Sequence, residues 1–112
     1  MNTKLPYCVY VLYSERDHMT YVGYTSDILR RTREHENGLN VSTSHRGPFQ
    51  LIFIEYYLFK DDAIKREKYL KTTPGRKTLS VMLATTIEKL KLKSNHGKAN
   101  TFIYHDEDST RK

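Results

Sequence analysis

An arginine and a histidine stand four positions apart, at Arg31 and His35, in a segment with a helical pattern. Residues at this spacing share one helix face, and Ile28 lies on that face with them. Arginine can hold a phosphate through two parallel hydrogen bonds, and histidine can exchange a proton near neutral pH. The pair therefore indicates chemistry on an anion. The open alternative is a solvated face on which His35 only sits near the helix C-terminus.

A carboxylate lies on the expected apolar stripe of a later helix. Glu67 stands four positions after Ala63 and three before Leu70. An ionised carboxylate inside a protein costs free energy unless it is paired. Glu67 is therefore expected either to pair with a cation such as Arg31 or to hold a metal ion. Judged by itself, the ion pair is the commoner arrangement.

Two tyrosines, Tyr10 and Tyr21, lie in neighbouring segments of strand character. Alternation along the strands allows both hydroxyls to face one side, although core packing explains two aromatic residues equally well. A phenol has a pKa of ~10, so a tyrosine acts as a base only where a cation or a metal lowers that value. Arg31, His35 and a metal at Glu67 would provide such a field.

The elements that must position these side chains follow from periodicity and turn signals. Residues 7–13 and 20–24 are rich in β-branched and aromatic types and flank a polar stretch, which predicts an antiparallel hairpin. Thr25, Ser26 and Asp27 supply capping chemistry for a helix that runs to about Asn37 and ends at Gly38.

The second half of the chain predicts one more strand and two helices. Residues 50–57 form a nearly continuous apolar run, which is expected to be the buried central strand. Helices are predicted over residues 61–71 and 79–93, separated by a break that contains Pro74 and Gly75. The order ββαβαα predicts an α/β (α+β) fold, a small three-stranded antiparallel sheet flanked by helices. Residues 5–93 would form the domain, and residues 94–112 a polar C-terminal tail.

Composition narrows the function classes. The formal net charge of +6 over 112 residues favours a polyanionic partner, with nucleic acid ahead of a membrane. Cys8 is the single cysteine, which excludes an internal disulfide and a cysteine-rich zinc cluster. No signal pattern opens the chain, and no apolar run reaches the ~18 residues of a membrane helix. A cytoplasmic protein with no membrane association is expected.

The motifs together resemble the GIY-YIG nuclease superfamily, in particular its small single-domain bacterial members, which are similar to the N-terminal domain of an excinuclease. The resemblance covers Tyr7 to about Lys77, with Cys8 at a position where the family usually has glycine. It rests on order and spacing, since Arg and His follow Gly23 by eight and twelve positions. The residues that carry it are Cys8-Val9-Tyr10, Tyr21-Val22-Gly23, Arg31, His35 and Glu67.

The resemblance implies hydrolysis of a DNA phosphodiester with one divalent ion, Mg²⁺ or Mn²⁺. It assigns water activation to Tyr10 with help from Tyr21, charge stabilisation on the phosphoryl oxygens to Arg31, proton transfer or phosphate contact to His35, and the metal to Glu67. A role in DNA repair or processing, and a protein partner for targeting, would fit such a nuclease. The alternatives are a non-catalytic nucleic-acid-binding module on the same fold and a structural domain with a buried Glu67–Arg31 pair.

Basic side chains around these motifs are candidates for contact with the DNA backbone. Many of them lie between residues 65 and 77, on and just beyond the Glu67 helix. The candidates for nucleic-acid binding are Arg46, Arg66, Arg76 and Lys77.

Overall fold

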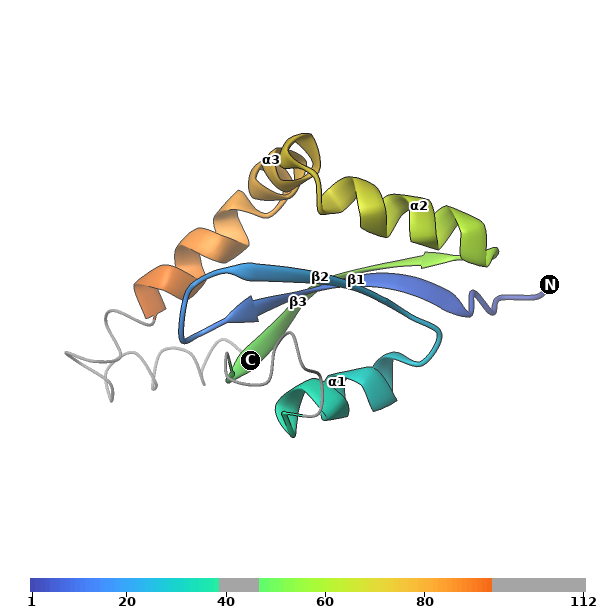
Figure 1. The fold of residues 1–112 in the computed structure, drawn as a ribbon, viewed down its shortest axis with the longest axis horizontal. Helices are drawn as coiled ribbons and strands as arrows, with labels where there is room; N and C mark the ends of the chain where they lie inside the picture. Colours follow the sequence, from blue (N-terminus) through green and yellow to red (C-terminus); the bar gives the residue numbers. More distant parts are fainter. Residues whose placement is uncertain (39–46, 94–112) are drawn as a thin grey trace.

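A three-stranded antiparallel sheet lies between helices in the computed structural model, which describes residues 1–38 and 47–93. Helix α1 covers one face of the sheet, and α2 and α3 lie on the other (Figure 1). The predicted fold and the order ββαβαα are confirmed. The elements are β1 (Tyr7–Ser14), β2 (Thr20–Thr25), α1 (Ile28–Glu36), β3 (Phe49–Tyr57), α2 (Lys60–Leu70) and α3 (Thr73–Met82).

The central strand is β1, because the strand order is β2-β1-β3. The prediction that residues 50–57 form the central strand is therefore wrong. From its second residue to its last, β1 is fully buried, whereas β3 is half-buried and leaves Tyr56 48% exposed. An apolar run shows that a strand packs against something, but it does not show how many strands pair with it. The first strand pairs with both of the others, and β3 lies at an edge.

The predicted ends of α1 are confirmed. The Asp27 side chain accepts a hydrogen bond from the Arg30 backbone N–H, so it caps the helix N-terminus. Asn37 is the C-cap, and Gly38 follows with a φ of 70°, a left-handed conformation that favours glycine.

The predicted break before the last helix is wrong, because α3 begins at Thr73 and includes Pro74 and Gly75. Thr72 caps it by accepting a hydrogen bond from the Gly75 N–H at 3.1 Å. Proline is tolerated in a first helical turn, where its missing N–H has no partner within the helix. A turn at Leu83 ends α3, and residues 84–93 are helical again.

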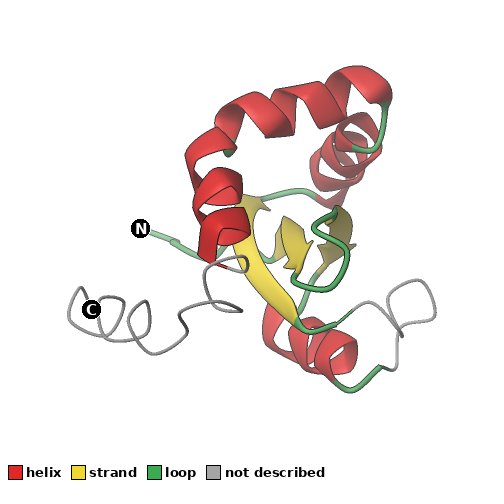
Figure 2. Cartoon of the chain, turned by 90° about the vertical axis from the view of Figure 1, so that its left-hand side faces the viewer, coloured by secondary structure: helices red, strands yellow, loops and turns green. Residues whose placement is uncertain are grey.

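The main core fills the space between the sheet and the α2–α3 layer, which Figure 2 shows from the side. Alternate residues of β1 face this core, and the ones between them face α1. None of the helices in the described ranges is long and apolar enough to cross a membrane. The buried members of the core cluster are Val9, Val11, Ala63, Leu70 and Leu79.

Gly75 allows the first turn of α3 to lie directly against the end of α2. A Cβ at this position would collide with the backbone oxygen of Tyr69 and would lie 2.6 Å from Leu70 Cα. A backbone cannot rotate away as a side chain can, so we expect Gly75→Ala to lower the free energy of unfolding by about 3 kcal/mol. Urea denaturation measures the loss. Ser80→Ala, on an exposed position of the same helix, is the control and should change stability by less than about 0.5 kcal/mol. If Gly75→Ala is as stable as the wild type, the close contact between α2 and α3 does not contribute to stability.

Candidate active site

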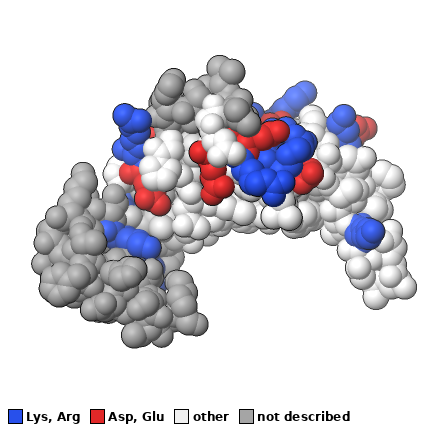
Figure 3. Space-filling view, turned by 90° about the horizontal axis from the view of Figure 1, so that it is seen from below, with Lys and Arg blue, Asp and Glu red and all other residues white. Residues whose placement is uncertain are grey.

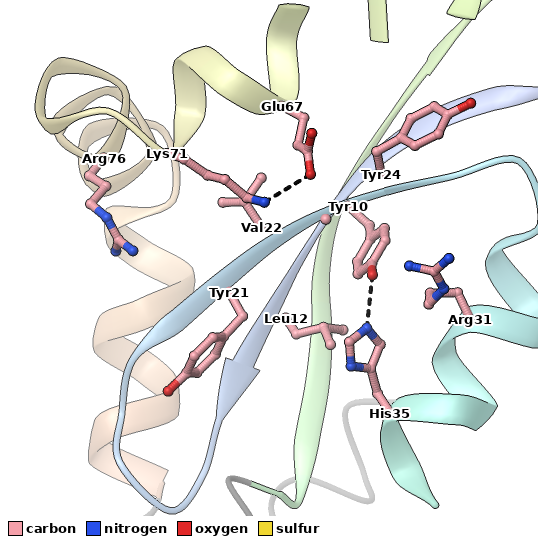
Figure 4. A pocket seen from close by; sticks show the side chains of 11 residues that line it. Tyr10, Leu12, Tyr21, Val22, Tyr24, Arg31, His35, Glu67, Lys71 and Arg76 are labelled. Carbon is pink, nitrogen blue, oxygen red and sulfur yellow. Dashed lines mark hydrogen bonds and ion pairs between the residues drawn. The ribbon is translucent and has the colours of Figure 1, made fainter. Parts of the chain in front are cut away.

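A pocket of about 370 Å³ brings the five predicted catalytic residues together at the β2 edge of the sheet (Figure 4). Arg76, one of the predicted nucleic-acid contacts, also lines it. The pocket draws on strands β1 and β2, on α1 from one layer and on α2 and α3 from the other. Its lining residues are Tyr10, Leu12, Tyr21, Val22, Gly23, Tyr24, Arg31, His35, Glu67, Lys71 and Arg76.

Gly23 determines how close Tyr10 comes to the edge strand. The two residues are paired across β1 and β2. A Cβ on Gly23 would collide with Cζ and Oη of the Tyr10 ring. The ring therefore lies against the bare backbone of β2, which any larger residue would prevent. In Figure 4 the side chains of α1 lie on one side of this strand and those of α2 on the other.

The Tyr10 hydroxyl and the His35 ring form the hydrogen-bonded centre of the α1 side. The distance from Tyr10 Oη to His35 Nε2 is 2.8 Å. Tyr10 is 2% exposed and His35 is 6% exposed. The edge of Phe49 packs against the His35 ring, with the ring centroids 6.0 Å apart, and helps to hold its orientation. Both side chains are thus fixed before any substrate arrives.

Burial decides the protonation state of this pair. It lowers the pKa of His35 below the ordinary value of 6.5, and the nearby Arg31 charge lowers it further. Burial also raises the pKa of Tyr10 above 10.0, opposed by Arg31 and reinforced by the Glu67 charge. At neutral pH the tyrosine is protonated and the histidine is neutral. A neutral imidazole carries one ring proton, and when that proton is on Nδ1 the tyrosine hydroxyl donates to Nε2. This is the direction needed for the proton to leave Tyr10.

The depressed pKa of His35 makes stability depend on pH. Between the native pKa of His35 and 6.5, the unfolded chain binds a proton at His35 that the native protein does not bind. The free energy of unfolding therefore decreases as the pH falls from 6.5 to the native pKa. Below the native pKa no further loss occurs. We expect urea denaturation between pH 8 and pH 5 to show this slope in the wild type and a shallower one in His35→Gln. Identical slopes would show that His35 titrates normally.

Arg31 and Glu67 do not form the ion pair that was considered from the sequence. Arg31 Nε lies 3.1 Å from Glu34 Oε1, in a direction that makes no hydrogen bond, and Figure 4 shows the guanidinium beside Tyr10. Glu67 Oε2 instead accepts a hydrogen bond from Lys71 Nζ at 2.9 Å. Glu67 does pair with a cation of the protein, as one alternative expected, but the suggested partner Arg31 is wrong because α1 and α2 lie on opposite faces of the sheet. The spacing of four residues between Glu67 and Lys71 was the signal that pointed to the correct partner.

The second tyrosine is held differently from the first. The Tyr21 hydroxyl donates to Asp17 Oδ2 at 2.6 Å, within the hairpin, and its ring packs edge-on against Phe49. In Figure 4 this hydroxyl points away from Tyr10. The structure thus places His35 at Tyr10 and Asp17 at Tyr21, a difference that the sequence left open.

The other predicted DNA contacts are dispersed. Arg66 lies outside the lining of the pocket and makes two hydrogen bonds to Glu55, at 2.9 and 3.1 Å. Lys77 is exposed and does not line the pocket, and Arg46 lies outside the described residues. Sequence reasoning did not single out Lys71 or Tyr24 for this site.

Charge is mixed on the face that carries α1. Figure 3 shows Lys and Arg side chains interspersed with Asp and Glu on this face. Arg30, for example, pairs with Glu34 at 2.8 Å and lies 3.7 Å from Asp27. A uniformly basic surface therefore does not explain the site on this side, and its chemistry depends on individual side chains.

Comparison with known proteins identifies the arrangement. The family model of the GIY-YIG catalytic domain matches residues 6–80. The chain belongs to the GIY-YIG family. This confirms the resemblance seen in the motifs, and it identifies the domain as one of a family of nucleases. The predicted tail, residues 94–112, lies outside the described residues.

Small GIY-YIG relatives are similar to most of this chain. It is 30% identical over 82 residues to the UPF0213 protein CPE1444 of Clostridium perfringens, covering 72% of this chain and 87% of that protein. Identity to a UPF0213 protein of Limosilactobacillus reuteri is 32% over 92 residues, covering 80% and 95%. A Giardia intestinalis protein named structure-specific endonuclease subunit SLX1 homolog is 33% identical over 90 residues, which cover 77% of this chain and 25% of that protein. No solved structure gives a significant match.

The GIY-YIG pocket offers one carboxylate to a metal. Glu67 has an 18% exposed side chain and is the only Asp or Glu among the described lining residues. No group of three His, Cys, Asp or Glu side chains suited to a metal occurs in residues 1–38 and 47–93. This donor set does not suit zinc, which takes three or four protein ligands. It fits Mg²⁺ or Mn²⁺, because such ions keep several waters and take further oxygens from a phosphate.

Proposed function

We propose that this protein is a divalent-metal-dependent endonuclease that hydrolyses DNA phosphodiester bonds. The observation that carries the proposal is the buried hydrogen bond between a protonated Tyr10 and a neutral His35, beside Arg31 and across the pocket from Glu67. Such a pair provides a base at neutral pH, and the other two side chains provide charge of both signs. A domain that only bound nucleic acid would need no proton acceptor behind a tyrosine.

The mechanism uses the Tyr10 oxygen as the group that faces the attacking water. Tyr10 passes its proton to His35 Nε2 and takes one from the water, so the proton moves inward along an existing hydrogen bond. The water oxygen bonds to phosphorus as the bond to the leaving deoxyribose oxygen breaks, and that oxygen takes a proton from solvent. Arg31 stabilises the charge that develops on the phosphoryl oxygens, and its planar fork suits a phosphate. One Mg²⁺ or Mn²⁺ bound by Glu67 would neutralise charge at the phosphate.

In this proposal, Tyr21 and the basic residues position the DNA. Tyr21 lines the pocket with its hydroxyl held by Asp17, and it would help to position the DNA there. Arg76 lines the pocket and would contact the DNA backbone close to the scissile bond. Arg66 and Lys77 would contact phosphates farther away, and so would Arg46.

The DNA form is proposed to be a branched or otherwise irregular structure. The printed name of the Giardia intestinalis relative, a structure-specific endonuclease subunit, supports this class. We further propose a cytoplasmic role in DNA repair or processing, with a protein partner for targeting. The edge strand β2 separates the α1 side of the pocket from the α2–α3 side. A DNA backbone that bends around β2 would therefore reach both sides.

The test is cleavage of single-stranded, duplex, nicked and branched DNA by the purified protein with Mg²⁺, Mn²⁺ or EDTA. We expect products with a metal ion and none in EDTA. A Tyr10→Phe preparation purified in the same way controls for a contaminating nuclease. DNA binding without products on every substrate would favour the alternative, a nucleic-acid-binding module that keeps the nuclease fold.

A further inference from the structure

Lys71 places an ammonium group on the carboxylate of the pocket. Its Nζ lies 2.9 Å from Glu67 Oε2, and both residues line the pocket. Lys71 is the C-cap residue of α2, one helical turn after Glu67. Figure 4 shows its side chain extended toward Glu67. The cation thus lies inside the site, next to the group that the proposed function gives to a metal ion.

Stability alone is a weak reason for this contact. The Lys71 side chain is 51% exposed, and exposed pairs at this spacing contribute about 0.3–0.5 kcal/mol. The Glu67 side chain is only 18% exposed, so its charge is the one that needs compensation. The same charge acts on Tyr10, where it raises the pKa of the hydroxyl. Lys71 therefore offsets the negative charge of Glu67 in the site itself.

One carboxylate cannot give its full interaction to two cations at once. When a divalent ion binds Glu67, the ammonium and the ion repel each other at close range. The long, half-exposed Lys71 side chain has room and rotamer freedom to leave. A phosphate brought into the pocket would be the nearest new anion. Arg76 already lines the same α2–α3 side of the pocket.

We propose that Lys71 is an exchangeable partner of Glu67: it holds the carboxylate in the metal-free protein, yields it to a divalent ion and then contacts a DNA phosphate. This inference rests on the proposed function, because it needs the metal at Glu67 and DNA in the pocket. It makes Lys71 a competitor of the metal and, once displaced, a substrate-binding residue. A purely structural salt bridge would do neither.

The first experiment measures Mn²⁺ affinity of the DNA-free protein by electron paramagnetic resonance, which needs no catalysis. We expect Lys71→Met to bind Mn²⁺ about twofold more tightly than the wild type, because a competing ion pair at this spacing is worth about 0.3–0.5 kcal/mol. Lys71→Arg keeps the positive charge and should bind close to the wild-type value. Lys65→Met removes an equal charge from an exposed position of α2 outside the pocket lining and is the matched control. Equal affinities in Lys71→Met and Lys65→Met would overturn the inference.

The second experiment measures DNA affinity at several salt concentrations in a Tyr10→Phe background, in which cleavage is expected to be slow. With Mn²⁺ present, Lys71→Met should reduce the slope of log affinity against log salt by about one phosphate contact. In EDTA the slope should hardly change, since Lys71 then stays with Glu67. The same reduction in both conditions would overturn the exchange. Absence of metal-dependent cleavage by the wild type would instead overturn the proposed function, so the two failures can be told apart.

Discussion

Tyr10→Phe is expected to slow DNA cleavage by about a thousandfold, within the range that a positioned acid or base contributes. The change removes one oxygen, the atom that accepts the proton of the attacking water in the proposed mechanism. The ring still fills its place against Gly23. The loss of the buried hydrogen bond to His35 should cost about 1 kcal/mol of stability, too little to unfold the domain.

Tyr13→Phe is the matched control for this experiment. Tyr13 lies on the same strand, is 1% exposed and has a 2.6 Å hydrogen bond between its hydroxyl and His18 Nδ1. Its side chain does not line the pocket. The two variants should lose similar stability by urea denaturation, and only Tyr10→Phe should lose cleavage in single-turnover assays. If both variants cleave at the wild-type rate, Tyr10 is not the base.

Glu67→Gln should abolish metal-dependent cleavage, with a loss of at least ~10³-fold, because the metal contributes several kcal/mol to charge stabilisation. The amide keeps the size of the side chain but binds a divalent ion poorly. DNA affinity in EDTA should be unchanged or slightly higher, since a negative charge has left a pocket that receives phosphate. Fluorescence anisotropy and single-turnover cleavage on the same DNA separate the two effects.

Glu55→Gln provides the comparison for the Glu67 variant. Glu55 is also a partly buried carboxylate paired with a cation, Arg66, but it lies outside the pocket. Its replacement should affect stability and leave the metal dependence of cleavage unchanged. If Glu67→Gln retains cleavage with an unchanged Mg²⁺ requirement, Glu67 has no role in holding the metal.

The sequence was sufficient where a local rule determines the structure. The hairpin, the capped α1 and the spacing that places Arg31 and His35 on one face all depend on neighbouring residues, and the structure confirms the elements. The motif residues are brought together in one pocket as expected. Their roles in catalysis stay predictions until the variants are measured.

Errors arose where the answer depended on tertiary partners. The apolar run of residues 50–57 could not reveal that it pairs with one strand, and the Pro74-Gly75 pair reads as a break unless the Thr72 cap is recognised. Arg31 was considered as a partner of Glu67 because the sequence does not show that α1 and α2 lie on opposite faces. The hydrogen bond between Tyr10 and His35 joins residues 25 positions apart, so no periodicity could have predicted it.

The position of the site across β2 ties catalytic competence to the cooperativity of folding. One half of the pocket belongs to the α1 layer and the other to the α2–α3 layer, and an edge strand of six residues lies between them. Local opening of that short strand would separate the halves even while the main core stayed intact. Amide hydrogen exchange of β2 should therefore report the fraction of active molecules better than global unfolding does, and DNA that bridges both layers should slow that exchange.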